Sequence, residues 1–334
     1  MTDSRKYQRI LVTGGVGFIG SHIVDKLMEE DFAVTVIDNL RTGSLANINR
    51  QQNKKNLNFV EGDIRDINLV KKTLKDVEVV FHEAALANVT FSVKDPILTN
   101  QINVEGTLNL LKASCDLNVK RFIYASSAAV YGKTKSPQKK EDDNLNPTSP
   151  YGISKLAAEK YVQVFQKLYG IETVCLRYFN VYGPRQRVDV HGSYGGVISI
   201  FINRILKNMP PIINGDGEQT RDFVYIDDVI KANVLAMNSK KGVGEVFNIA
   251  TGKNISINQV AEILKHKMKR ENLKNIHTEP RPTDIKHGYA NISKAKKILG
   301  YEPRFSIEEG LAKLVNWYTK RPSEMPQTNK QKGN

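Results

Sequence analysis

The sequence has few cysteines and no long apolar run, and each shortage excludes a class of protein. Its 334 residues include only Cys115 and Cys175, which lack any metal-like spacing. A disulfide framework and a cysteine metal site are therefore excluded, and we expect two buried thiols in a reducing compartment. No stretch approaches the roughly 18 apolar residues of a membrane span, and the polar start MTDSRKYQR does not read as a signal peptide. We expect a cytoplasmic protein.

Acidic residues are also in short supply, since 49 Lys and Arg face 35 Asp and Glu for a net charge of +14. The lysines are scattered along expected helix faces and gathered near the C-terminus, without an aromatic–basic platform or a groove-reading motif. Such a surface favours an anionic small molecule, so we expect neither a nucleic acid nor a membrane as partner. A non-catalytic dinucleotide- or RNA-binding protein stays open as the alternative class.

The stretch RILVTGGVGFIGSHIVDKL, residues 9–27, joins an apolar strand to a helix through a glycine turn. Gly14 and Gly17 would let the backbone turn tightly and approach a pyrophosphate, and Gly20 would let the helix pack closely on the strand. The helix N-terminus then offers unpaired N–H groups to an anion. A second strand, AVTVID, ends on Asp38, where an acid would reach the ribose hydroxyls of a dinucleotide. This context favours a dinucleotide site over a glycine turn without a ligand.

Strands and helices alternate along most of the chain. This order predicts an α/β protein with a doubly wound parallel sheet, the Rossmann type, and a smaller C-terminal substrate lobe. The expected strands cover 9–13, 33–37, 57–60, 77–81, 120–125 and 171–179, all nearly apolar. We expect the nucleotide domain at 5–180 and 222–254, with a helix at 227–237 and a strand in EVFNIA, the substrate lobe at 181–221 and 255–321, and a disordered tail at 322–334.

Two loops that follow these strands have side chains able to contact a dinucleotide. Asp63 and Ile64 follow the third strand, where a carboxylate would meet the adenine amine and an apolar side chain would wall the ring. Asp63 could instead cap the helix that starts at Asp66. Ala84 and Ala85 follow the fourth strand, and their small side chains would let the cofactor backbone lie close, although they could also serve packing alone.

The fifth strand ends in two serines, and a long helix follows from Pro150. Tyr151 and Lys155 stand four apart on one face of that helix. A lysine beside a phenol and a cationic nicotinamide are together expected to lower the tyrosine pKa from about 10 toward working pH, which makes a general base. Ser127 would hydrogen-bond the same substrate oxygen, or simply cap a turn. Tyr131 also begins a Tyr-x-x-x-Lys match, but GKTKSPQ after it cannot hold a helix.

GGVGFIG, Asp38, SSAAVYG, PYGISK and RYFNVYGPRQ together resemble the extended short-chain dehydrogenase/reductase family, and more narrowly the UDP-hexose 4-epimerases, from about residue 9 to 301. The resemblance implies a catalytic set of Ser127, Tyr151 and Lys155, with Tyr151 as base on the sugar 4-hydroxyl. It implies NAD as cofactor, bound by Gly14, Gly17, Phe18, Ile19, Asp38, Asn39, Asp63, Ile64, Ala84, Ala85, Asn103, Tyr151, Lys155 and Tyr178.

The resemblance also implies a UDP-sugar substrate, held by Ser127, Tyr151, Asn180, Val197, Ile198, Arg221, Arg281, Asp284 and Gly288. Arg221 and Arg281 would hold the diphosphate, as two arginines from separate segments are able to do. Asp284 would contact the nucleoside. Gly288 falls where the family controls access beside the hexose 2-substituent, and a glycine there implies acceptance of UDP-GlcNAc and UDP-GalNAc as well as UDP-glucose and UDP-galactose. The alternative for Gly288 is a turn with positive φ.

Several rivals belong to the same family. Nucleotide-sugar 4,6-dehydratases place an Asp–Glu pair just after the triad hydroxyl, where this chain has Ala128 and Ala129. UDP-uronate epimerases and decarboxylases stay open. Val16, Glu83 and Ala87 depart from the usual pattern at the cofactor and put its tight binding in question. By resemblance, helices at about 97–117 and 151–169 would pair across a two-fold axis, giving a homodimer.

Overall fold

A parallel sheet of seven strands forms the centre of the computed structural model, which describes residues 6–134, 136–187, 196–280 and 286–320. The strands lie in the order β12-β7-β5-β4-β1-β2-β3. Their bounds are β1 Arg9–Thr13, β2 Ala33–Asp38, β3 Leu57–Glu61, β4 Val79–His82, β5 Arg121–Ser127, β7 Glu172–Tyr178 and β12 Val246–Ile249. The order reverses between β1 and β4, which is where a doubly wound sheet binds its ligand. The predicted fold class is confirmed.

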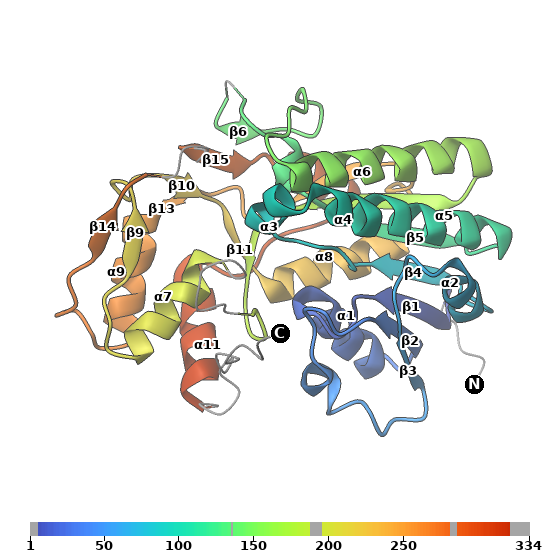
Figure 1. Cartoon of the computed structure of the whole chain (residues 1–334), viewed down its shortest axis with the longest axis horizontal. Coiled ribbons are helices and arrows are strands. Elements are labelled where there is room, and N and C mark those ends of the chain that lie inside the picture. Colours follow the sequence, from blue (N-terminus) through green and yellow to red (C-terminus); the bar gives the residue numbers. More distant parts are fainter. Residues whose placement is uncertain (1–5, 135, 188–195, 281–285, 321–334) are drawn as a thin grey trace.

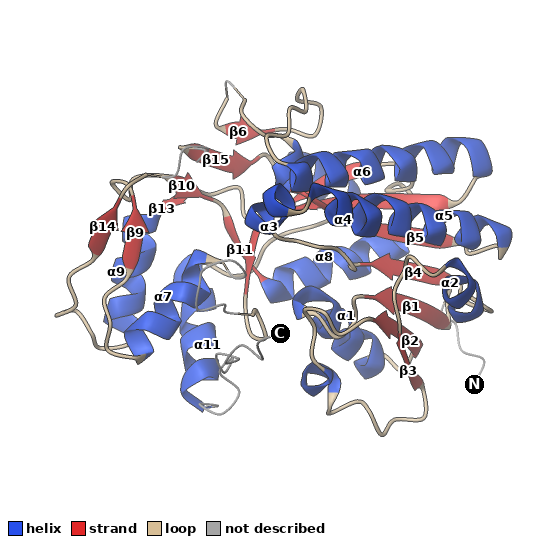
Figure 2. Cartoon of the chain, in the orientation of Figure 1, coloured by secondary structure: helices blue, strands red, loops and turns tan. Residues whose placement is uncertain are grey.

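Helices cover both faces of this sheet (Figure 1, Figure 2). One layer contains α1 (Phe18–Glu29), α8 (Ile226–Asn238) and α10 (Ser293–Leu299); the other contains α2 (Ile67–Thr73), α5 (Gly106–Asp116) and α6 (Pro150–Tyr169). Side chains of β1 alternate between the two cores, since Ile10 and Val12 join one cluster and Leu11 the other. Burial on both faces explains why the strands are almost wholly apolar.

The helix expected at about 97–117 is interrupted. Asp95 caps α4 (Pro96–Asn100), a π-helical turn follows at Gln101–Glu105, and α5 then continues the path. A short α3 (Val89–Lys94) precedes it. Such π turns frequently occur at functional sites, and this one contains Asn103.

A smaller lobe lies to the left in Figure 1. Its described residues form a four-stranded sheet, two strand pairs and three helices. The sheet order is β13 (Ile255–Ser256), β10 (Thr220–Arg221), β15 (His287–Ala290) and β6 (Gln138–Lys139); the pairs are β9 (Ile212–Asn214) with β14 (Ile276–Thr278) and β8 (Asn180–Tyr182) with β11 (Phe223–Tyr225); the helices are α7 (Val197–Leu206), α9 (Ile257–Lys267) and α11 (Ile307–Lys320).

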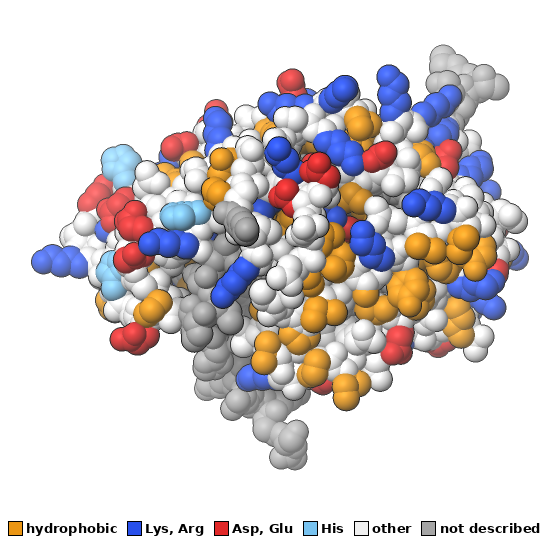
Figure 3. Space-filling model, turned by 90° about the horizontal axis from the view of Figure 1, so that it is seen from above, with side chains coloured by type: hydrophobic (Ala, Val, Ile, Leu, Met, Phe, Trp, Pro, Cys, Tyr) orange, Lys and Arg blue, Asp and Glu red, His pale blue; other side chains and the backbone are white. Residues whose placement is uncertain are grey.

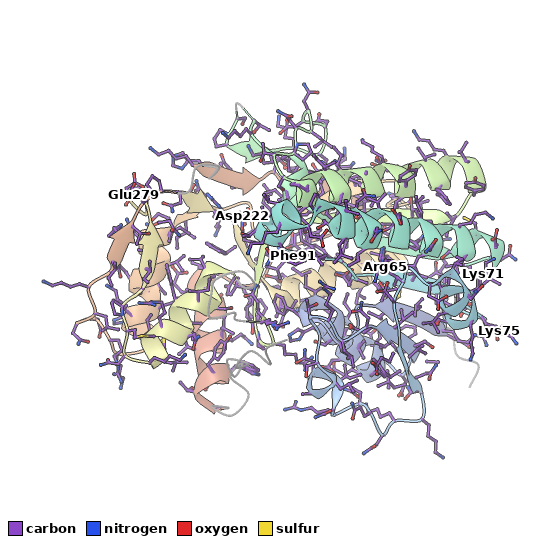
Figure 4. All side chains as sticks on the ribbon, in the orientation of Figure 1. Arg65, Lys71, Lys75, Phe91, Asp222 and Glu279 are labelled. Atoms are coloured by element: carbon purple, nitrogen blue, oxygen red, sulfur yellow. The ribbon has the colours of Figure 1, made fainter. Side chains whose placement is uncertain are left out.

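The two lobes exchange segments at points that the sequence ranges did not anticipate. β6 comes from the first half of the chain yet pairs with β15, and α10 packs on β12 and α8 although its residues were assigned to the substrate lobe. Asp222, labelled in Figure 4, lies between β10 and β11 and accepts hydrogen bonds from the backbone N–H groups of Thr251, Gly252 and Ala290. This buried carboxylate ties three segments together where the lobes meet.

In the part of the chain that the structure describes, no helix combines the length and apolar character needed to cross a bilayer. Cys175 is buried as expected, but Cys115 is only half-buried and packs at the margin of the core formed with α5. Both thiols are free.

Candidate active site

A cavity of about 650 Å³ opens at the carboxyl edge of the sheet, beside β1, β2 and β4. Ten of the expected cofactor residues line it: Gly14, Gly17, Phe18, Ile19, Asp38, Asn39, Asp63, Ile64, Ala84 and Ala85. Asn180, Arg185 and Gln186 line it from the side of the smaller lobe. Its volume lies within the range of small-molecule and cofactor sites.

The glycine turn shapes one wall of this cavity. Gly14 has φ +66°, and a Cβ there would lie 2.8 Å from the backbone nitrogen of Ala84. A Cβ on Gly20 would lie 2.2 Å from the Gly14 carbonyl oxygen, so α1 packs this closely only with glycine. Gly17 caps α1 without any side-chain hydrogen bond, which leaves the first N–H groups of the helix for an anion. The residues present fit the pyrophosphate of a dinucleotide.

Two carboxylates lie at the other end of the cavity. Asp38 accepts hydrogen bonds from the N–H groups of Val16 (3.2 Å) and Leu40 (2.9 Å), and burial raises its pKa. Asp63 accepts from the Asn39 amide (3.0 Å) and from the Arg65 guanidinium, which lowers the pKa of Asp63 to about 2. Asp66, not Asp63, caps α2, so the capping alternative for Asp63 is wrong.

Tyr151 begins the long helix α6, behind the cap residue Ser149 and with Pro150 in the first turn. The Ser127 hydroxyl, at the end of β5, hydrogen-bonds the Tyr151 phenol. Ser127 Oγ also accepts from the N–H of Ala129 (3.1 Å), so the serine caps a turn and contacts the tyrosine at once. Tyr131 lies elsewhere: its buried hydroxyl donates to Asn248 Oδ1 (2.6 Å).

Lys155 is placed differently from the expectation. Its ammonium, 4% exposed, donates to the Ala125 carbonyl oxygen at 2.8 Å and lies 5.0 Å from the Tyr124 ring centre, rather than bonding the Tyr151 phenol. Burial raises the pKa of Tyr151, and only the Ser127 hydrogen bond opposes that rise. Lys155 by itself therefore does not lower the Tyr151 pKa in this structure. Burial also lowers the pKa of Lys155, to about 8.

Asn103 connects the π turn to the start of α6. Its amide donates to the Ser154 hydroxyl (2.9 Å), which donates to the Tyr151 carbonyl (2.8 Å), and its Oδ1 accepts from the N–H of Leu86 (2.7 Å). Its carbonyl accepts from Thr107 Oγ1 at 2.7 Å. Asn103 therefore positions the loop after β4 against the helix of Tyr151.

A buried histidine extends this chain of hydrogen bonds. Because Thr107 donates its proton to Asn103, His82 Nε2 must donate to Thr107 (2.8 Å), and His82 Nδ1 accepts from Thr13 Oγ1 (2.7 Å). Burial lowers the pKa of His82 to about 3, so this residue is neutral. The network joins the end of β1 to the end of β4 and α5.

Tyr178 does not line the cavity, because Glu83 stands in front of it. The Tyr178 hydroxyl donates to Glu83 Oε1 at 2.9 Å and accepts from the Asn233 amide at 2.8 Å. Burial raises the pKa of Glu83 to about 7, against the opposing effects of the Tyr178 hydrogen bond and the Lys155 charge. Sequence reasoning noted Glu83 only as a departure from the family pattern.

The expected substrate residues lie in different places. Asn180 lines the cavity and donates from Nδ2 to the Asp222 carbonyl (2.9 Å). Gly288 pairs with Arg221 across β15 and β10, so it lies within a strand and the turn alternative is wrong. Ile198 is only 1% exposed and lies in the core, and the half-buried Val197 packs against that core; neither is among the residues that line the cavity. Arg281 and Asp284 lie outside the described residues.

Arg185 is a cavity residue that the sequence interpretation missed. It has φ +66°, and its guanidinium donates to Asp25 (2.5 Å) and Ser21 (3.2 Å) on α1. Arg185 belongs to the motif RYFNVYGPRQ. Because it directly follows Gly-Pro, it could have been singled out as a cation after a turn. Arg185 follows β8 along the chain, and its positive charge lies against α1.

Known proteins resemble this chain over nearly its whole length. Residues 10–250 match the model of the NAD dependent epimerase/dehydratase family. A Methanocaldococcus jannaschii protein with the provisional name UDP-glucose 4-epimerase is 47% identical, over 92% of this chain and 97% of its own. A Thermodesulfobacterium geofontis UDP-glucuronate 4-epimerase is 39% identical, over 92% and 95%. The structure of UDP-N-acetylglucosamine 4-epimerase from Methanobrevibacter ruminantium, in complex with UDP-N-acetylmuramic acid, superposes with TM-score 0.89 at 42% identity, over 95% and 100%.

Proposed function

Because the chain belongs to the NAD-dependent epimerase/dehydratase family and is an isomerase of its nucleotide-sugar 4-epimerase group, we propose that it inverts C4 of a UDP-hexose. UDP-GlcNAc and UDP-GalNAc are its proposed main pair, with UDP-glucose and UDP-galactose as further substrates. The observation that carries the proposal is the contact of Ser127 with Tyr151 at the carboxyl edge of the sheet, the edge at which the cavity opens, although neither residue lines it. We propose that a sugar oxygen exchanges its proton with this hydroxyl pair.

In the proposed mechanism, Tyr151 accepts the proton of the sugar 4-hydroxyl while Ser127 hydrogen-bonds the same oxygen. Gly14, Gly17 and Asp38 would hold NAD, which supplies an acceptor for the C4 hydride and returns it. The sugar is a 4-keto species between these steps and turns about its link to the diphosphate. Tyr151 then returns the proton to the oxygen on the inverted carbon.

Lys155 would assist Tyr151 by charge, not by direct contact. Its ammonium is fixed by the Ala125 carbonyl and the Tyr124 ring. A positive charge held in this low-dielectric site favours the tyrosinate that forms when a proton leaves. Burial raises the pKa of Tyr151 in the protein without ligands. We therefore propose that Lys155 assists Tyr151 only when the cofactor and the sugar are bound.

The choice of sugar rests on Gly288 and its neighbour. Gly288 is paired with Arg221, which we propose contacts the diphosphate, so a side chain at 288 would extend beside the hexose. Glycine adds no bulk there, which supports acceptance of an acetamide at C2. Incubation with UDP-GlcNAc, UDP-glucose and UDP-glucuronate, followed by NMR of the sugar, tests the function; failure to invert any of the three would contradict it. Turnover of UDP-glucuronate alone would make the uronate epimerase the better assignment.

Gly288→Tyr tests this specificity directly. The ring would fill the space for the acetamide, so we expect turnover of UDP-GlcNAc to fall by at least about tenfold relative to UDP-glucose, the range that one steric contact provides. Gly288→Ala serves as the matched control with little added volume. Equal loss on both sugars by Gly288→Tyr, in kcat/KM measurements, would contradict the role of Gly288.

We further propose a homodimer built on the helical layer of α3 to α6. Its exposed side chains include an unusual number of large apolar ones: Val89, Val93, Ile97, Leu117, Ile153, Tyr161, Val164, Leu168 and Tyr169. In Figure 3, hydrophobic side chains gather on the right-hand half of this upper face. A second copy related by a two-fold axis would cover the same surface on both molecules.

A further inference from the structure

Glu83 is a cavity-lining carboxyl group that the proposed mechanism does not use. It follows β4 directly, and its backbone N–H donates to the Thr13 carbonyl at 3.3 Å. Its side chain is half-buried and lines the same cavity as Gly14, Ala84 and Ala85. A carboxylate in such a place is costly unless something compensates its charge.

The surroundings hold the carboxylate in place but do not neutralise it. Tyr178 donates to Oε1 at 2.9 Å, and Asn233 fixes that tyrosine from α8 with an amide 2.8 Å from its hydroxyl. Both partners are uncharged. The other titratable groups that face Glu83 are Tyr124 on β5 and Tyr151 and Lys155 on α6, and of these only Lys155 is a cation.

Glu83 acts on the reacting end of the site. Its charge raises the pKa of Tyr151 and supports the protonated form of Lys155. Tyr151 is the group beside which a hydride and a proton leave the sugar in the proposed mechanism. An oxidised nicotinamide carries a positive charge at that end and a reduced one does not.

We propose that the Glu83 carboxylate sets the preference of this protein for the oxidised over the reduced form of its nicotinamide cofactor. With Glu83 present, its negative charge offsets the ammonium of Lys155. Without it, Lys155 would be left uncompensated beside a second cation. The interaction of two charges in a low-dielectric site is strong enough to alter a binding ratio about tenfold. The inference rests on the family's cofactor and does not depend on which sugar is turned over.

The test compares binding of NAD⁺ and NADH, each alone, by calorimetry at pH 7.5 in the full chain. Glu83→Gln keeps an oxygen that accepts from Tyr178 but removes the charge. We expect the ratio of the two affinities to move toward NADH by about tenfold, the change that one pKa unit of interaction represents. Glu83→Asp, which keeps a carboxylate, is expected to retain most of the preference.

A second variant and a control test the role of the charge. Tyr178→Phe removes the hydrogen bond that opposes the rise of the Glu83 pKa, so more of the carboxyl is neutral at pH 7.5 and the ratio should move in the same direction as in Glu83→Gln. Glu61→Gln removes an exposed carboxylate at the end of β3 and should change neither affinity. An unchanged ratio in Glu83→Gln, or a shift of the ratio toward NAD⁺ in Tyr178→Phe, would overturn the proposal. Failure of the sugar assay would not overturn it, because the calorimetric test contains no sugar.

The Glu83→Gln variant is expected to fold. Because burial raises the Glu83 pKa to about 7, the folded chain binds more protons than the unfolded chain from about pH 4.5 to about 7. The ionised carboxylate therefore costs stability above that window, and the neutral amide removes the cost. Thermal unfolding at pH 8 should show a variant at least as stable as the wild type; a large loss of stability would mean that Glu83 is needed for folding and would contradict the assigned role.

Discussion

Tyr151 is the residue on which the chemistry depends, and its surroundings hold the proton firmly in the free protein. Burial raises its pKa, Glu83 raises it further, and the Ser127 hydrogen bond is what opposes them. Such a phenol becomes a base only when other charges enter the site. The enzyme would therefore resist abstracting protons until cofactor and sugar are both in place.

Tyr151→Phe should abolish turnover while leaving UDP-sugar binding largely intact, because the variant loses only the group that carries the proton. General-base transfer contributes about a hundredfold to ten-thousandfold, so kcat should fall by that factor. Calorimetric titration with UDP-GlcNAc checks binding, and NMR of the sugar checks turnover. Ser149→Ala, which removes only the helix cap 3.1 Å from the Gly152 N–H, is the control and should keep most activity. Near-normal turnover by Tyr151→Phe would refute the assignment.

At this scale, the residues that depend on local backbone geometry could be predicted from the sequence. Gly14 and Gly20 lie where neighbouring backbone atoms leave no room for a Cβ. The spacing of the glycines in the sequence was enough to predict this. The orientation of Lys155 could not be predicted, because it depends on a carbonyl and a ring contributed by β5. The role of Glu83 depends on Tyr178 and Asn233, which are 95 and 150 residues away along the chain.

Helix α6 is anchored to the sheet by a buried ion pair. Glu159, one turn beyond Lys155, receives two hydrogen bonds from the Arg177 guanidinium (2.7 and 3.0 Å) and one from the Ser126 hydroxyl (2.6 Å). Both charged side chains are at most 2% exposed. Because Ser126 precedes Ser127, the pair also fixes the strand end against the catalytic helix.

Glu159→Gln should lower the free energy of unfolding by about 3–5 kcal/mol, the usual cost of leaving a buried charge without its partner. Urea unfolding followed by circular dichroism measures the change. Lys112→Ala removes a surface ion pair with Asp116 on α5 and should change stability by less than about 1 kcal/mol. A loss in Glu159→Gln no larger than that of the control would show that the pair does not anchor the helix.

The elements themselves were largely predictable, since apolar strands and capped helices have short-range signals. The π turn at Gln101–Glu105 was not, because its sequence QINVE is compatible with an ordinary helix. The extra residue in that turn is accommodated by the Asn103 contacts with Leu86 and Ser154. Those contacts exist only once β4 and α6 are in place.

The whole molecule presents one helical layer to solvent with an apolar surface. Ile97 and Leu168 are 72% and 70% exposed on α4 and α6. The small lobe has fewer such residues among those described, with Met209, Ile212 and Ile276 the exposed ones. This asymmetry is what a two-fold interface on one face requires.

Ile97→Glu should convert a dimer to a monomer, because a charge would be buried in an apolar interface. Light scattering at micromolar concentration should give twice the chain mass of 37.6 kDa for the wild type and the single mass for the variant. Ile276→Glu, on β14 of the small lobe, is the matched control and should remain a dimer. A monomeric wild type would rule out the proposed assembly.

The assignment of segments to the two lobes was harder to predict than the strand order of the sheet. The switch between β1 and β4 follows from strand order, but the pairing of β6 with β15 joins residues about 150 positions apart. The placement of Ile198 in the core instead of the cavity depends on how α7 packs on α9, which a local pattern does not contain.

The central claim is that C4 is inverted by breaking and remaking its own C–H bond. UDP-GlcNAc labelled with deuterium at C4 tests it most directly, with the product analysed by NMR and mass spectrometry after incubation in ordinary water. We predict UDP-GalNAc that retains the deuterium at C4, because the hydrogen leaves that carbon and returns to its opposite face without exchange. Inverted product that has lost the deuterium to water would contradict the mechanism, and recovery of labelled substrate with no inversion would contradict the activity.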